Sequence, residues 1–197
     1  MDSQPLPPIF LFTDFGPHGP YPGQMQAVLA REAPGARVID LVNDAPRFDP
    51  ACAAHLLAAL VPELVPGSVV LAVVDPGVGT ASREPVVVEV DGRALVGPDN
   101  GLLHVAAARA ESRRRRVIGW RPERLLASFH GRDLFAPVAA ALWRGETPQG
   151  TEAPWAPGEL EGAGGDLGRV VYRDVYGNLM TGIRAAGLPR DRRLAIA

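Results

Sequence analysis

An aspartate and an arginine lie eight positions apart in the segment VVDPGVGTASRE, at residues 73–84. Asp75 ends an apolar run that is typical of a buried strand, and the glycines after it allow a turn that returns Arg83 toward it. A neighbouring arginine generally lowers the pKa of a carboxylate by about 1–3 units, so such a pair orients a reactant better than it removes a proton. His130, in SFHGRD, is the better proton acceptor, because an ordinary histidine has a pKa of about 6.5. We therefore expect Asp75, Arg83 and His130 to hold and aim one water molecule.

Further acids follow the predicted strands, at Asp14, Asp44 and Asp99. The carboxyl ends of parallel strands meet at one edge of a sheet, where α/β proteins bind their ligands. One acid in such a place is commonly a turn former or a helix cap, whereas several at one edge favour a binding site. The same three acids, with Asp75 and His130, also suit magnesium or manganese. A metal-dependent phosphoesterase is therefore an alternative prediction.

The elements that position these residues alternate along the chain. Three apolar runs predict strands buried on both faces, over 9–12, 37–42 and 68–74. Two helical patterns lie between them, over 22–33 and 50–65. This alternation predicts an α/β fold with a largely parallel sheet flanked by helices.

The second half of this domain adds a hairpin and two helices. The hairpin is expected over 86–97 with Asp91-Gly92 as its turn, and the helices are expected from Asp99 onward and over 133–145. The four arginines at 113–116 are interpreted as a solvated face without a function.

The composition divides the chain into three parts. Residues 1–145 are the predicted α/β domain, 146–168 a linker rich in Gly and Pro, and 169–197 a short C-terminal β segment that turns at Gly177-Asn178. The last segment is too short for a core of its own, so we expect it to pack on something else, such as another subunit.

Composition excludes several classes of function. The chain has twenty arginines and no lysine, which excludes a Walker lysine, a Schiff base and a pyridoxal phosphate anchor. The formal charge of −2 gives no case for a nucleic-acid partner. The single Cys52 is expected in the core. The acid and prolines near the N-terminus and the lack of a long apolar run predict a soluble, cytoplasmic protein without a membrane partner.

Five segments in order resemble the S-adenosyl-L-methionine (SAM) hydroxide adenosyltransferase family, whose members are SAM hydrolases related to fluorinase and chlorinase. The segments are TDFGPHGPYPGQMQAV, VVDPGVGTASRE, GPDNGLL, FHGRDLFAPVAA and DVYGNLMTGI. The resemblance implies attack of water on the ribose C5′ of SAM, giving adenosine and L-methionine. It also implies a homotrimer with sites between subunits, no cofactor and no metal.

The resemblance assigns roles by motif. Asp75, Arg83 and His130 correspond to the residues that activate water. The implied substrate-binding residues are Asp14, which grips the ribose hydroxyls, Phe48, Phe129, Gly131, Asp174, Tyr176 and Asn178. Phe129-His130-Gly131 favours water over halide, because the halide-using relatives lack this His-Gly pair.

Two features depart from the family pattern. Gly19 stands where the family usually has an acid, and the C-terminal β segment is expected to be a truncated form of the family's small β-barrel. A protein that binds SAM or adenosine with impaired turnover is therefore a further alternative.

Overall fold

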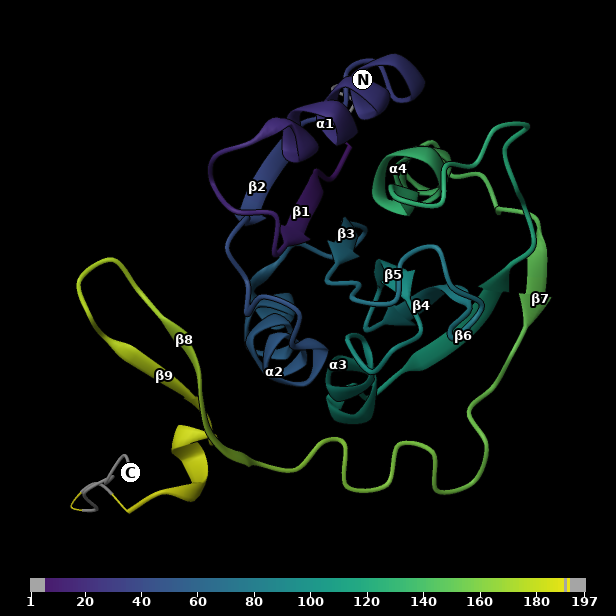
Figure 1. The fold of residues 1–197 in the computed structure, drawn as a ribbon. Helices are drawn as coiled ribbons and strands as arrows, with labels where there is room; N and C mark the ends of the chain where they lie inside the picture. Colours follow the sequence, from purple (N-terminus) through teal and green to yellow (C-terminus); the bar gives the residue numbers. More distant parts are fainter. Residues whose placement is uncertain (1–5, 190, 192–197) are drawn as a thin grey trace, which may run out of the picture.

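A seven-stranded sheet forms the centre of the molecule in a computed structural model, which describes residues 6–189 and 191 (Figure 1). Its strands lie in the order β2-β1-β3-β5-β4-β6-β7. In chain order they are β1 (Ile9–Thr13), β2 (Val38–Val42), β3 (Val69–Val73), β4 (Pro85–Val90), β5 (Arg93–Pro98), β6 (Arg113–Ile118) and β7 (Gly150–Glu152). The pairs β1–β2, β1–β3 and β3–β5 are parallel, and the remaining pairs are antiparallel. The predicted α/β fold with a largely parallel sheet is confirmed.

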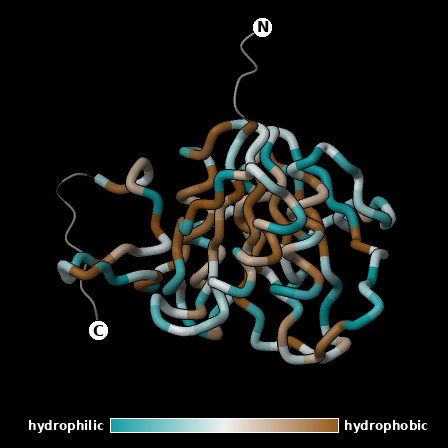
Figure 2. Tube along the Cα trace, turned by 90° about the horizontal axis from the view of Figure 1, so that it is seen from above, coloured by the Kyte–Doolittle hydropathy of each residue, from teal (hydrophilic) through white to brown (hydrophobic). Residues whose placement is uncertain are grey.

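Two helices cover each face of this sheet (Figure 1). On one face α1 (Pro20–Glu32) packs with α4 (Ala136–Trp143), and on the other α2 (Pro50–Leu60) packs with α3 (His104–Arg109). Each pair encloses its own apolar core against the strands, and apolar residues gather in the middle of the body in Figure 2. Every residue of β1 and β3 is buried because helices cover both faces, so these strands are apolar runs without alternation.

Local sequence signals set several boundaries. The Asp49 side chain accepts a hydrogen bond of 2.9 Å from the Cys52 backbone N–H and caps α2, which begins at Pro50. The helix ends earlier than expected, in a 3₁₀ turn η1 (Val61–Glu63). Cys52 is buried, as predicted.

The β4–β5 hairpin turns at Asp91 and Gly92, as predicted. Their φ angles are 46° and 77°, and positive φ at both central residues is typical of the type I′ turn of two-residue hairpins. In β5, a Cβ added at Gly97 would lie 2.3 Å from the Ala72 carbonyl oxygen, so only glycine allows β5 to approach β3 this closely.

Three expectations for the second half of the sheet are wrong. Arg113–Arg116 is not simply a solvated face but part of β6, where Glu89 of β4 pairs with Arg114. Residues 150–152, expected in the linker, form β7 at the sheet edge, because their backbone pairs with β6. Asp99 caps no helix, since α3 begins at His104 with Leu103 as its N-cap.

The expected C-terminal β segment is a hairpin of β8 (Leu167–Arg173) and β9 (Leu179–Gly182), followed by a 3₁₀ turn η3 (Ala185–Gly187). Its base packs on α2, while its tip projects away from the sheet (Figures 1 and 2). The Tyr172 hydroxyl donates to Asp44 Oδ1 at 3.0 Å and anchors the hairpin. Residues 1–5, 190 and 192–197 of the predicted domains lie outside the described residues, and the domain division stays a prediction.

No helix in the described ranges is long and apolar enough to cross a membrane.

Candidate active site

A cavity of about 400 Å³ opens at the carboxyl ends of β1 and β3. This is the sheet edge at which the sequence predicts a binding site. Its wall comes from the loops after these strands, the start of α1, the loop before α2, and the loop that leads into the π-helix η2 (Gly131–Phe135). The lining residues are Asp14, Phe15, Tyr21, Arg47, Phe48, Val73, Asp75, Val78, Ser128, Phe129, His130 and Gly131.

Asp75 and Arg83 form a buried, two-pronged ion pair beside this cavity. Arg83 Nε donates to Asp75 Oδ1 at 2.9 Å, and Arg83 Nη2 pairs with Oδ2. The two side chains are only 4% and 5% exposed. The turn between them needs Gly79, whose φ is +80° and whose added Cβ would lie 2.5 Å from the Ala127 carbonyl oxygen. The strand therefore ends on an acid that is fixed in orientation by its own arginine.

Arg83 also links this pair to His130. Its Nη2 lies 3.3 Å from His130 Nδ1. A guanidinium has only donors, so the contact assigns Nδ1 as the acceptor and places the proton of the neutral imidazole on Nε2. Burial lowers the pKa of His130, and the Arg83 charge lowers it further, which keeps the ring neutral near pH 7. The structure therefore brings the predicted trio together in the order Asp75, Arg83, His130.

This order changes the expected role of His130. A proton acceptor is expected from the sequence, but the Nδ1 lone pair is engaged by Arg83 and the other nitrogen carries a hydrogen. His130 lines the cavity, and its remaining ring nitrogen is thus a donor. The next residue is Gly131, where an added Cβ would lie 3.0 Å from Met25 Sδ, so a side chain there would disturb the packing against Met25 and Phe129.

Asp14 lies at the end of β1 and joins two loops of the wall. Its Oδ2 accepts a hydrogen bond of 3.0 Å from the Phe48 backbone N–H, and burial raises the pKa of its carboxyl group. Phe48 has a left-handed φ of 56°, and its ring is exposed at the mouth of the cavity. Asp14 and Phe48 therefore both line the cavity, and their substrate contacts stay a prediction.

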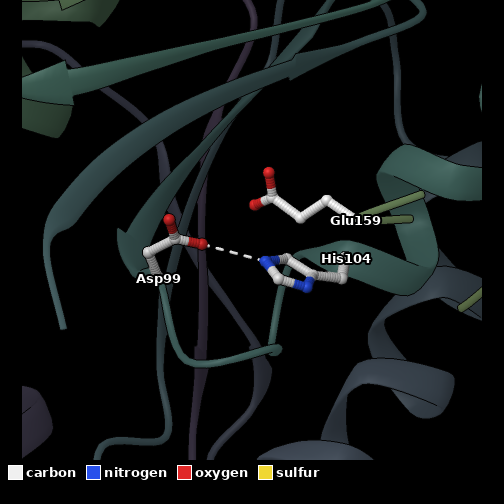
Figure 3. A group of neighbouring side chains, drawn as sticks. All are labelled: Asp99, His104 and Glu159. Atoms are coloured by element: carbon white, nitrogen blue, oxygen red, sulfur yellow. Dashed lines mark hydrogen bonds and ion pairs between the residues drawn. The ribbon is translucent and has the colours of Figure 1, made fainter. Parts of the chain in front are cut away.

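The five groups of the metal-dependent alternative do not converge. Both carboxylate oxygens of Asp75 bind Arg83, and Asp44 accepts from Tyr172. Asp99 lies in a different group, with His104 and Glu159 (Figure 3), and this is the only set of three or more possible ligands within 4.8 Å in the described part of the chain. Arg115 already binds Asp99 Oδ2 at 3.2 Å and also pairs with Glu159. The predicted five-residue metal cluster is therefore wrong.

Comparison with known proteins decides the family. The profile described as "SAM hydroxide adenosyltransferase N-terminal domain" matches residues 9–152. The chain belongs to this SAM hydroxide adenosyltransferase family.

Two relatives of the family carry the name (R)-S-adenosyl-L-methionine hydrolase. The protein of Thermus thermophilus is 41% identical over 88% of this chain and 73% of its own length, and that of Salinispora arenicola is 40% identical over 96% and 78%. The crystal structure of an uncharacterized conserved protein from Thermotoga maritima superposes with a TM-score of 0.71 at 36% identity. That alignment covers 75% of this chain and 58% of the Thermotoga chain.

The three C-terminal residues implied by the family resemblance do not line the cavity of their own chain. Asp174 accepts hydrogen bonds from the backbone N–H groups of Tyr176 and Asn178 and from the Asn178 amide, so it shapes the tip of the β8–β9 hairpin. The Tyr176 side chain is 88% exposed there. Within one chain the two halves of the expected site are therefore separate.

The cavity also contains residues that the sequence analysis missed. Phe15, Tyr21 and Arg47 line it, and the two aromatic rings contact each other and Phe129. Phe15 follows Asp14 directly, a spacing that signals its place at the strand end. Tyr21 lies in the first turn of α1, and nothing in the helical pattern alone distinguishes it from a surface residue.

Proposed function

We propose that this protein hydrolyses SAM to adenosine and L-methionine. The observation that carries the proposal is the buried series Asp75, Arg83 and His130 beside the cavity, in a chain of this family. Relatives at about 40% identity over most of the chain are named as hydrolases of the same compound.

The reaction is a displacement at carbon. The water oxygen forms a bond to the ribose C5′, the bond from C5′ to sulfur breaks, and its electron pair stays on sulfur. The sulfonium becomes the neutral thioether of methionine, and the water gives up one proton to solvent. Since the leaving group departs neutral, no general acid is needed, and alignment of the water supplies much of the rate gain.

The geometry supports distinct roles for the trio. His130 donates from Nε2 to the water oxygen, and the Asp75 carboxylate accepts from the same water. Arg83 lies behind both groups and fixes their orientation through its bonds to Asp75 and His130. A donor aimed at the oxygen stabilises its hydroxide character as the proton leaves.

The remaining cavity residues would bind the substrate. We assign Asp14 to the ribose hydroxyls, because its carboxylate lines the cavity at the end of β1. Phe48 would cover the nucleoside, while Phe129 and Gly131 shape the wall next to His130. The proposal includes no cofactor and no metal.

Product analysis tests this function. The purified protein is incubated with SAM, with and without a chelator, and adenosine and methionine are separated by chromatography. We expect equal release in both samples and its loss in His130→Ala, with His104→Ala as the matched control. Release that a chelator abolishes would support a metal-dependent enzyme instead. Binding of SAM without any release would support a binder that lacks turnover.

We further propose that the active form is a homotrimer in which the β8–β9 hairpin of one subunit completes the cavity of the next. The exposed tip with Asp174, Tyr176 and Asn178 supports this arrangement, because those side chains lie away from their own cavity. A cytoplasmic location without nucleic-acid partners belongs to the same proposal.

Complementation tests the shared site. His130→Ala and Tyr176→Ala are each expected to be inactive, and coexpression should restore roughly one quarter of the sites in randomly mixed rings. No recovery in mixed oligomers, or a monomer in light scattering with full activity, would contradict the shared site.

A further inference from the structure

Three aromatic rings contact one another in the wall of the cavity. The ring centroids of Phe15 and Tyr21 lie 5.5 Å apart, those of Phe15 and Phe129 5.8 Å, and those of Tyr21 and Phe129 5.2 Å. The interplanar angles run from 52° to 84°, so no two rings stack in parallel. Tilted rings in a cavity wall leave π-faces that a ligand can meet.

One of these rings already interacts with a cation of the protein. The Arg132 guanidinium lies over Phe129, 5.2 Å from the ring centroid, and is held there by Gln24 at 2.8 Å. This distance is within the range of a cation–π interaction. Neither Phe15 nor Tyr21 has such a partner among the described residues. Phe15 and Tyr21 line the cavity without such a partner, so they are available to a positively charged ligand there.

Each carboxylate of the cavity already interacts with an arginine or with a hydrogen-bond donor. Asp75 is bound by Arg83, while Asp14 accepts from the Phe48 N–H and lies in the field of Arg47. His130 is neutral near pH 7, because burial and Arg83 lower its pKa. The charged groups thus balance one another and leave no dedicated counterion for a substrate cation.

We propose that Phe15 and Tyr21 bind the sulfonium of the substrate through their π-faces, so that the cavity selects cationic SAM over its neutral thioether counterpart. This inference rests on the proposed function. A sulfonium is a cation bonded to three carbons, the kind of group that aromatic faces recognise in quaternary ammonium ligands.

The change in charge along the reaction predicts whether this contact affects substrate binding or turnover. The positive charge is full in bound SAM, partial in the transition state and absent in methionine. A cation–π contact therefore stabilises the bound substrate at least as much as the transition state, so its loss raises KM and does not lower the rate of the chemical step. The attraction also ends when the carbon–sulfur bond breaks, which aids release of methionine.

A pair of substitutions at Tyr21 tests the proposal. Tyr21→Leu removes the ring, and Tyr21→Phe keeps the ring but removes the hydroxyl. Dissociation constants for SAM, neutral S-adenosylhomocysteine and a SAM analogue with a protonated amine in place of the sulfonium are measured by calorimetry. All proteins carry His130→Ala, so that SAM is not consumed.

With Tyr21 or Tyr21→Phe we expect SAM and the amine to bind more tightly than the thioether. Tyr21→Leu should reduce this preference about fivefold, the size of an exposed cation–π contact. With His130 intact, Tyr21→Leu should raise KM by a similar factor and should not lower kcat. Phe15→Leu should act in the same direction.

Four outcomes would overturn the inference. The first is equal affinity for SAM and the thioether in the protein with Tyr21, and the second is an amine analogue that binds no more tightly than the thioether. The third is a preference for SAM that Tyr21→Leu leaves unchanged, and the fourth is a Tyr21→Phe variant that loses this preference as fully as Tyr21→Leu. The first outcome needs no substitution at Tyr21, and the Tyr21 side chain is about half exposed, so the leucine disturbs little packing. Failure of the proposed function would be seen separately, as absence of adenosine release by the unsubstituted protein.

Discussion

Two groups in this molecule combine an aspartate, an arginine and a histidine, and they are connected differently. Beside the cavity, Arg83 is the central member and binds both Asp75 and His130. In the second group, Asp99 is central and binds His104 Nε2 at 2.9 Å (Figure 3). Asp99 also binds Arg115 at 3.2 Å. The first pair is 4–5% exposed, whereas Asp99 and His104 are 19% and 24% exposed.

The order of the contacts decides what each histidine can do. His130 accepts a hydrogen bond from Arg83 through Nδ1, so its Nε2 carries the hydrogen, and the residue lines the cavity. His104 points its Nε2 at Asp99, and neither residue lines that cavity. Arg115 also binds Glu159, so the second group fastens the crossover between β7 and β8 to the sheet. Residue types alone therefore do not identify a site.

The largest expected difference between the groups is in stability. Asp75→Ala leaves Arg83 buried without its partner and should lower the free energy of unfolding by about 3–5 kcal/mol. Asp99→Ala should cost much less, because Arg115 keeps Glu159 and the site is more exposed. Urea unfolding followed by circular dichroism measures both. Equal losses would remove the distinction between the two groups.

Activity should separate the two histidines. His130→Ala removes a donor aimed at the reacting oxygen, so kcat should fall by about 10²–10³, as for other donors to developing charge. His104→Ala should stay within about twofold, since that ring contacts only structural partners. Initial rates of adenosine formation at saturating SAM give both values. A comparable loss in His104→Ala would contradict the assignment.

His130 should give the activity a distinct dependence on pH. Burial and Arg83 lower its pKa, so kcat/KM should hold as pH falls past about 6.5. It should decline only when Nδ1 takes a proton, because that proton removes the acceptor for Arg83 and with it the orientation of the ring. In that window the unfolded chain binds the proton first, so the contribution of His130 makes the protein less stable as pH falls.

Titration of the His130 imidazole by NMR checks this direction. Arg83→Gln removes the second cause of the shift and should move the pKa upward. An unchanged or lower pKa in that variant would show that Arg83 does not set the protonation state of His130.

The smallest effect on stability is expected at Glu159, which contacts the second group through Arg115. Glu159→Gln weakens a partly exposed ion pair with Arg115 and should cost about 0.2–1 kcal/mol of stability, with no change in activity. The shift in the urea midpoint gives the value. A larger loss, or a change in kcat, would mean that the crossover supports the active site.

Much of the fold follows from the sequence because its signals are local. The buried strands around 9–12 and 68–74 are apolar runs, Asp49-Pro50 starts a helix, and Asp91-Gly92 turns a hairpin. Strand β6 is not predicted from the sequence because its four arginines lack the alternation of polar and apolar residues that is typical of a half-buried strand. Its pairing with β4 and β7 is long-range and therefore invisible to a local pattern.

In the candidate site, the position of Asp75 at a strand end and the return of Arg83 toward it can be predicted from the sequence, since both depend on one short turn. The contact of Arg83 with His130 Nδ1, the contacts of Phe15 and Tyr21 with Phe129, and the separate location of Asp99 follow from the tertiary structure alone. These contacts join segments up to about a hundred residues apart. They arise from packing of the loops around the cavity, and no local propensity encodes them.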